Sequence, residues 1–125
     1  MQDKKLFESL AYEIYNWCKE KELWGDNCIY FNGKALASWS EWSGVHGVKI
    51  YDDLYEYENK NPLDYFEYAH PDTLSMSFEG DLYYVLNGYT SGCYQLWDEF
   101  EKLFEKYDLY YELGNAWNLS ACKRY

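Results

Sequence analysis

The sequence is short of basic residues, and this shortage excludes one large class of function. Eleven lysines and arginines stand against 22 acidic residues in a chain of 125, and Arg124 is the single arginine. With both histidines neutral, the formal net charge is −11. A protein that binds nucleic acid by neutralising phosphates needs a basic surface. We therefore expect no direct nucleic-acid binding by this chain.

Long apolar runs and paired cysteines are also absent. No run of about 18 apolar residues occurs, so we expect no transmembrane helix. Charged residues close to Met1 interrupt any signal-peptide core, which favours a cytoplasmic protein. The four cysteines form no Cys-x-x-Cys pair, whereas zinc ligands normally arrive as closely spaced pairs. The sequence therefore predicts reduced, mostly buried thiols and no metal site.

Recognisable catalytic motifs are missing as well. Neither His46 nor His70 has a serine or cysteine at the spacing of a known nucleophile motif. Gly44 and Gly47 lack the strand–helix context and the lysine of a phosphate-binding loop. We expect no catalytic residue and no cofactor. A small enzyme that uses His46 or His70 remains an alternative.

What the chain has in abundance is aromatic residues, which make up 22% of it. Acidic disordered segments are poor in aromatics, so this content indicates a folded protein. Apolar residues at three- and four-residue steps predict long amphipathic helices over 6–18 and 94–107. The same spacing predicts a shorter helix over 61–69 and another that begins near Leu82 and is ended by Gly88.

Turn residues predict two hairpins. Asn32-Gly33 can supply the two positive φ angles of a tight turn, and β-forming residues flank it. Gly114-Asn115 predicts a second turn, between strands at 109–113 and 117–121. Residues 40–47 are predicted as a loop. The remaining strands are predicted at 48–51, at 52–58 as a half-exposed strand, and at 74–78 with one face buried.

These elements together predict one α+β domain over residues 1–125. Hairpins give an antiparallel sheet, because a tight turn joins strands that run in opposite directions. The two long amphipathic helices need an apolar surface to cover, and one face of that sheet provides it.

The negative charge is confined to one part of the sequence. Residues 1–51 carry a net charge of −1, residues 52–112 carry −12 and the last thirteen residues carry +2. Alternate residues of a strand stand about 6.5 Å apart, and helix positions i and i+4 about 6 Å apart. Both spacings are near that of phosphates along a nucleic-acid strand, so a row of carboxylates can present itself to a basic groove much as a backbone does.

Acidic residues and tyrosines alternate most densely just after residue 51. Tyrosine adds flat, amphipathic contact area and is enriched at binding surfaces. We therefore predict a surface that contacts a basic protein partner, made of Asp52, Asp53, Tyr55, Glu56, Tyr57, Glu58, Asp64 and Glu67. The alternative is that these carboxylates are a solvated face that serves solubility alone.

In size, acidity and tyrosine content the chain resembles small inhibitor proteins of phages and mobile elements, of the anti-CRISPR and antirestriction kind that mimic nucleic acid. The resemblance implies a non-enzymatic inhibitor in the cytoplasm of a bacterial host, bound to the basic nucleic-acid-binding surface of a defence nuclease. The alternative is an immunity or antitoxin protein that neutralises a basic nuclease toxin through the same electrostatic contacts.

Overall fold

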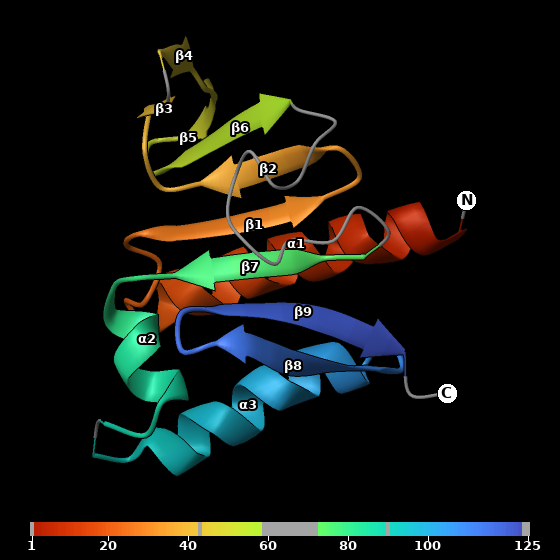
Figure 1. Ribbon diagram of the computed structural model, residues 1–125, viewed down its shortest axis with the longest axis vertical. Helices are drawn as coiled ribbons and strands as arrows, with labels where there is room; N and C mark the ends of the chain where they lie inside the picture. The colour runs from red at the N-terminus through yellow and green to blue at the C-terminus, as the bar shows by residue number, and fades with distance from the viewer. Residues whose placement is uncertain (1, 43, 59–72, 90, 124–125) are drawn as a thin grey trace.

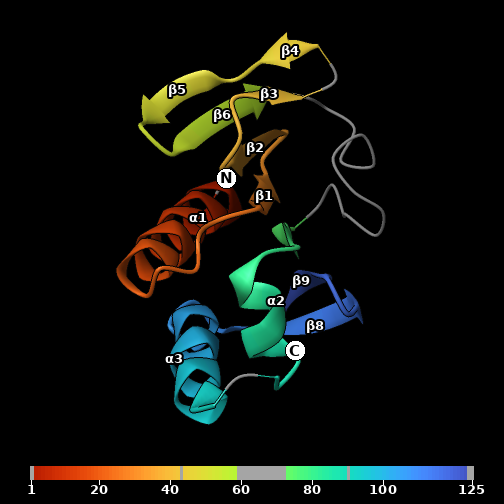
Figure 2. The same cartoon turned by 90° about the vertical axis from the view of Figure 1, so that its left-hand side faces the viewer.

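A seven-stranded antiparallel sheet organises the part of the chain that the structure describes. This computed structural model describes residues 2–42, 44–58, 73–89 and 91–123. The strands are ordered β5-β6-β2-β1-β7-β9-β8 (Figure 1). Two long helices, α1 (Gln2–Glu20) and α3 (Cys93–Glu105), lie on the same side of the sheet in Figure 2. The predicted α+β class is confirmed.

The strands of the main sheet are β1 (Asn27–Phe31), β2 (Lys34–Ala37), β5 (Val48–Tyr51), β6 (Leu54–Glu58), β7 (Ser75–Phe78), β8 (Leu109–Asn115) and β9 (Asn118–Lys123). A short helix, α2 (Asp81–Leu86), precedes α3. Two-residue strands β3 (Glu41–Trp42) and β4 (Val45–His46) pair with each other. The predicted helix over 61–69 lies outside the described residues.

The first hairpin forms as its turn residues predict. Asn32 and Gly33 both have positive φ, +53° and +78°, and join β1 to β2. This backbone conformation matches the right-handed twist of the flanking strands, which is why Asn-Gly is a strong hairpin signal.

The second hairpin forms, but its predicted turn at Gly114-Asn115 is wrong. The turn residues are Ala116 and Trp117, because Asn115 pairs with Asn118 across the ladder. Asparagine side chains close this turn: Asn115 Oδ1 accepts from the Trp117 N–H at 2.9 Å, and Asn118 Oδ1 accepts from the Asn115 N–H at 3.2 Å. Gly114 instead lies where the register shifts, as in a β-bulge.

Two further predictions are wrong. Residues 40–47 are not a plain loop, because Glu41–Trp42 and Val45–His46 pair as the small β3–β4 hairpin. Strand β7 is predicted to have one buried face, but all four of its residues are buried, so both faces are. β1 and β9 flank both of its edges, and on the face away from the helices Ser75 shares a hydrogen bond of 2.8 Å with Ser120 of β9.

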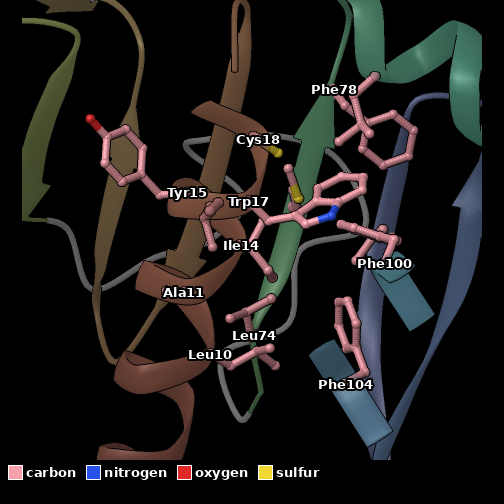
Figure 3. Packing of buried hydrophobic residues seen from close by; sticks show 14 of the residues in the cluster. Leu10, Ala11, Ile14, Tyr15, Trp17, Cys18, Leu74, Phe78, Phe100 and Phe104 are labelled. Carbon is pink, nitrogen blue, oxygen red and sulfur yellow. The ribbon is translucent and has the colours of Figure 1, made fainter. Parts of the chain in front are cut away.

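Two apolar clusters lie on opposite faces of the sheet. The larger one joins the inner stripes of α1 and α3 to β7 and its neighbours, around Ile14, Phe100 and Phe104 (Figure 3). The smaller one lies on the other face and contains Cys28, Tyr30, Ala35, Ala37 and Tyr57. Sheet and helices thus fix the directions in which the charged side chains point.

The cysteine prediction is confirmed: all four thiols are free, and Cys18, Cys28 and Cys93 are buried. Burial raises the pKa of Cys28 to about 12, so this thiol stays protonated near neutral pH. None of the described helices is long and apolar enough to cross a membrane.

Candidate acidic binding surfaces

Strand β6 separates the predicted contact residues onto two faces of the sheet. Leu54 belongs to the helix-side core, and Glu56 shares its face, opposite Leu36 in the register. Tyr57 points to the other face, opposite Ala35. Because side chains of a strand alternate, its acids and its tyrosines do not form one mixed ridge. The predicted Asp64 and Glu67 lie outside the described residues.

Asp53 is a structural tie between α1 and the β5–β6 turn. Its carboxylate accepts a hydrogen bond from the Tyr15 hydroxyl at 2.7 Å and forms an ion pair with Lys19. The Trp24 indole N–H donates to the Asp53 carbonyl at 2.7 Å. Partial burial raises the pKa of Asp53, but the bonds from Lys19 and Tyr15 outweigh it and hold the pKa below its usual value. This carboxylate is engaged within the fold.

Two more of the predicted acids have lysine partners. Lys49 Nζ lies 3.2 Å from the Asp52 carboxylate, and Lys34 Nζ lies 3.8 Å from that of Glu56. Asp52 is fully exposed, so its pair with Lys49 is weak. Glu58 is exposed at the end of β6. This surface therefore carries less net charge than the sequence alone suggests.

The two predicted contact tyrosines also differ from expectation. Tyr57 is only 4% exposed and donates its hydroxyl hydrogen bond to the Trp39 carbonyl at 2.8 Å, so it is a core residue and no contact residue. Tyr55 is half-buried, and its hydroxyl reaches the Asp52 carbonyl at 3.3 Å. Both positions point to the face of the sheet away from the helices, where apolar neighbours cover them.

The inner side of α3 carries a second structural tie. Glu99 accepts a hydrogen bond from the Trp17 indole at 3.0 Å and lies 3.2 Å from Lys21 Nζ. The bond from Trp17, followed by that from Lys21, lowers the pKa of Glu99. In the same way Glu13 of α1 accepts from Lys106 and Tyr107 just beyond α3. We call Glu13, Asp53 and Glu99 the α1 ties.

The outer side of α3 presents carboxylates of a different kind. Asp98, Glu101 and Glu105 follow one stripe of the helix, and Asp98 pairs with Lys102 at 2.9 Å. Glu101 and Glu105 line a cavity of about 300 Å³ together with Tyr110 and Tyr111 of β8. We call these four residues the α3–β8 cavity.

Aromatic packing holds the floor of the α3–β8 cavity in place. The Tyr111 ring lies 5.2 Å from both Phe100 and Phe104, whose rings belong to the core. Burial, followed by the charge of Glu101, raises the pKa of Tyr111 to about 12. Tyr110 is exposed and donates to Glu112 at 3.1 Å. The cavity thus joins carboxylates and tyrosine hydroxyls on a rigid base.

Sequence reasoning missed this cavity, although its signal is present. Asp98, Glu101 and Glu105 recur at three- and four-residue steps, which marks an acidic stripe on one side of the helix. That the stripe faces Tyr110 and Tyr111 depends on the packing of β8 beside α3, which spacing alone does not give.

The histidines form no catalytic arrangement in the described part of the chain. His46 lies on the β3–β4 hairpin with its side chain 79% exposed, and its Nε2 is 3.3 Å from Glu41. His70 lies outside the described residues. No group of three or more histidine, cysteine or acidic side chains in the described ranges could hold a metal ion.

Comparison with known proteins adds no relative to this description. No protein family, no curated protein and no solved structure matches the chain. The fold class is shown by the structure alone, as an α+β arrangement of hairpins and helices.

Proposed function

We propose that this chain is a non-enzymatic inhibitor that binds the basic, nucleic-acid-binding surface of a nuclease. The observation that carries the proposal is the α3–β8 cavity, where the outward acids of α3 meet exposed and half-buried tyrosines. The resemblance of the chain to phage-borne inhibitors points to a bacterial defence nuclease as the partner.

The spacing of the α3 acids supports this proposal. Successive acids of the stripe are three or four residues apart, so their Cβ atoms stand about 5–6 Å apart. Phosphates along a nucleic-acid strand repeat at a similar distance, and a groove that binds them presents lysines and arginines at matching intervals. The stripe therefore offers such a groove a set of anions held on a helix.

The net charge of −11 would speed the association of this chain with a basic partner, but it would not select one basic partner over another. Opposite charge steers association and raises the on-rate, an effect that salt weakens because it screens exposed charges. The tyrosines of the cavity then supply desolvated contact area with few rotatable bonds. Charge brings the partner in, and packed side chains determine whether it stays.

The test compares two charge-reversed variants of equal net charge. Glu101→Lys/Glu105→Lys reverses the α3–β8 cavity, and Asp52→Lys/Glu58→Lys reverses two exposed acids of the surface that the sequence predicts. Partners captured from a bacterial lysate by the unchanged chain are identified, and their affinity for all three proteins is measured at several salt concentrations.

We expect the captured partner to be a nuclease that duplex nucleic acid displaces from the chain. Glu101→Lys/Glu105→Lys should weaken its binding at least tenfold, and Asp52→Lys/Glu58→Lys should weaken it much less. The unchanged chain should inhibit cleavage by the nuclease. A partner that binds the chain and nucleic acid simultaneously, with no loss of cleavage, would falsify the proposal.

A further inference from the structure

Three exposed tyrosines gather at the junction of α2 and α3. Tyr84 is 50% exposed, Tyr89 70% and Tyr94 75%. Figures 1 and 2 both place α2 beside the start of α3, at the end of the molecule away from the β3–β4 hairpin. We call Tyr84, Tyr89 and Tyr94 the tyrosine patch. Exposed aromatic side chains in a group, rather than singly, mark an interaction surface.

The end of α2 determines the position of two of these rings. Gly88 has a φ of +78°, and the Tyr89 N–H donates to the Tyr84 carbonyl at 2.8 Å. With the Gly88 N–H bonded to the Val85 carbonyl at 3.1 Å, this is a Schellman motif. The motif turns the chain back, so that the Tyr89 ring lies 6.5 Å from that of Tyr84.

The third ring joins the patch through a tryptophan. Tyr94 stands edge-on to Trp97, with ring centroids 5.1 Å apart. A Cβ added at Gly88 would lie 3.4 Å from the Trp97 ring, so the end of α2 packs directly on this residue. The Trp97 indole also donates to the Val85 carbonyl. The three tyrosines therefore stand on one fixed base.

The sequence that carries the tyrosine patch is acidic. Residues 71–101 contain six acidic residues and no lysine, arginine or histidine. Asp81 lies one helical turn before Tyr84, and Asp98, which pairs with Lys102 at 2.9 Å, lies one turn after Tyr94. Aromatic faces and carboxylates together attract a cation.

We propose that the tyrosine patch receives arginine side chains of the basic partner, an inference that rests on the proposed function. A guanidinium is planar, more weakly hydrated than an ammonium and able to stack on a tyrosine face while it donates to a carboxylate. Lysine can do only part of this. A second copy of the chain is a poor occupant, because its matching surface carries the same negative charge.

The experiment measures binding of labelled hexa-arginine and hexa-lysine peptides by fluorescence anisotropy. We expect hexa-arginine to bind more tightly, and Tyr89→Leu or Tyr94→Leu to weaken it about two- to fivefold, the range for exposed cation–π contacts. Tyr89→Phe keeps the ring and should retain the preference. Tyr51→Leu, at an exposed tyrosine of β5, is the matched control and should change nothing.

The outcomes separate this inference from the function on which it rests. Glu101→Lys/Glu105→Lys should weaken both peptides alike and leave the arginine preference intact. If that variant acts as expected but the leucine variants leave the preference unchanged, the arginine site is overturned and the proposed function stands. If neither set weakens binding, both are overturned. A dimer in sedimentation equilibrium that Tyr89→Leu abolishes would assign the patch to a second copy and overturn the arginine site.

Discussion

The two sides of α3 carry the same residue type in two different roles. On the inner side, Glu99 joins Trp17 and Lys21 of the α1 region, and on the outer side Glu101 and Glu105 line a cavity with two tyrosines of β8. Only Phe100 separates Glu99 from Glu101 in the sequence. Their surroundings, rather than their chemistry, determine whether a carboxylate joins two helices or stands on the outer face of one.

This difference shows that net charge alone does not distinguish carboxylates that stabilise the fold from carboxylates that stand at its surface. A carboxylate that accepts hydrogen bonds from buried or half-buried donors is part of the fold, since removal leaves those donors unsatisfied. A carboxylate at an exposed position, paired with a lysine or with none, contributes little to stability. Substitutions at the α1 ties and at the outer acids should therefore have different effects on the free energy of unfolding.

The largest expected effect is at Asp53. Asp53→Ala removes the acceptor of Tyr15 and the partner of Lys19, and should lower the free energy of unfolding by about 2 kcal/mol. Asp52→Ala, at the adjacent and fully exposed position, should change it by less than about 0.5 kcal/mol. Urea unfolding followed by tryptophan fluorescence measures both. Equal losses of unfolding free energy at the two positions would show that the contacts of Asp53 with Tyr15 and Lys19 do not stabilise the fold.

A smaller effect is expected at the donor of the same bond. Tyr15→Phe keeps the ring, which packs edge-on against Trp24 at 4.9 Å, and deletes only the hydroxyl. The free energy of unfolding should fall by about 1 kcal/mol, the ordinary value of one hydrogen bond. Tyr51→Phe is the control, because Tyr51 stacks on Tyr15 at 6.1 Å but is 58% exposed. It should leave the urea midpoint unchanged.

The pH dependence of stability sharpens the comparison further. The pKa of Asp53 is lower in the folded state than its ordinary 3.8, so its contribution is complete above about pH 4 and is lost as the pH falls through the folded value. Glu99 shifts in the same direction. The difference in unfolding free energy between the unchanged chain and Asp53→Asn should therefore shrink below pH 4. A difference that stays constant from pH 7 to pH 3 would contradict this.

The smallest effect on stability is expected at the outer acids. Glu101→Gln/Glu105→Gln removes the repulsion between two like charges and also the attraction between Glu105 and Lys102, so it should change the free energy of unfolding by no more than a few tenths of a kcal/mol. The same variant should weaken binding to a basic partner. Thermal unfolding by circular dichroism checks the first result. A loss of more than about 1 kcal/mol would place these carboxylates among the structural ones.

Local chemistry made much of the fold predictable. The apolar stripe of α1 and the Asn32-Gly33 turn each specify their structure through residues a few positions apart. The turn at Ala116-Trp117 escaped prediction because the bonds that close it come from Asn115 and Asn118 rather than from a glycine at positive φ. The burial of all four residues of β7 depends on tertiary packing and not on the strand's own pattern.

The binding surface was predicted less well, for a physical reason. Asp53 is 38 positions from Tyr15, and no spacing rule connects them. Counting acids in the sequence placed the surface at 52–67, whereas the structure shows that Asp53 is tied and Tyr57 is buried. The pattern of Glu101 and Glu105 was visible, but its tyrosine neighbours come from β8, which the sequence did not place beside α3.

The ties of α1 also have a consequence for how the chain folds during synthesis. Trp17 and Glu99 are 82 positions apart, and Glu13 and Tyr107 are 94 apart. A ribosome must therefore pass residue 99 before Trp17 meets Glu99 and residue 107 before Glu13 meets Tyr107, whereas Asp53 can reach Tyr15 and Lys19 much earlier. Contacts of such high sequence separation slow folding, because a long loop must close before they form. Until then the apolar stripe of α1 can be shielded only by β-strands from its own half of the chain or by a chaperone.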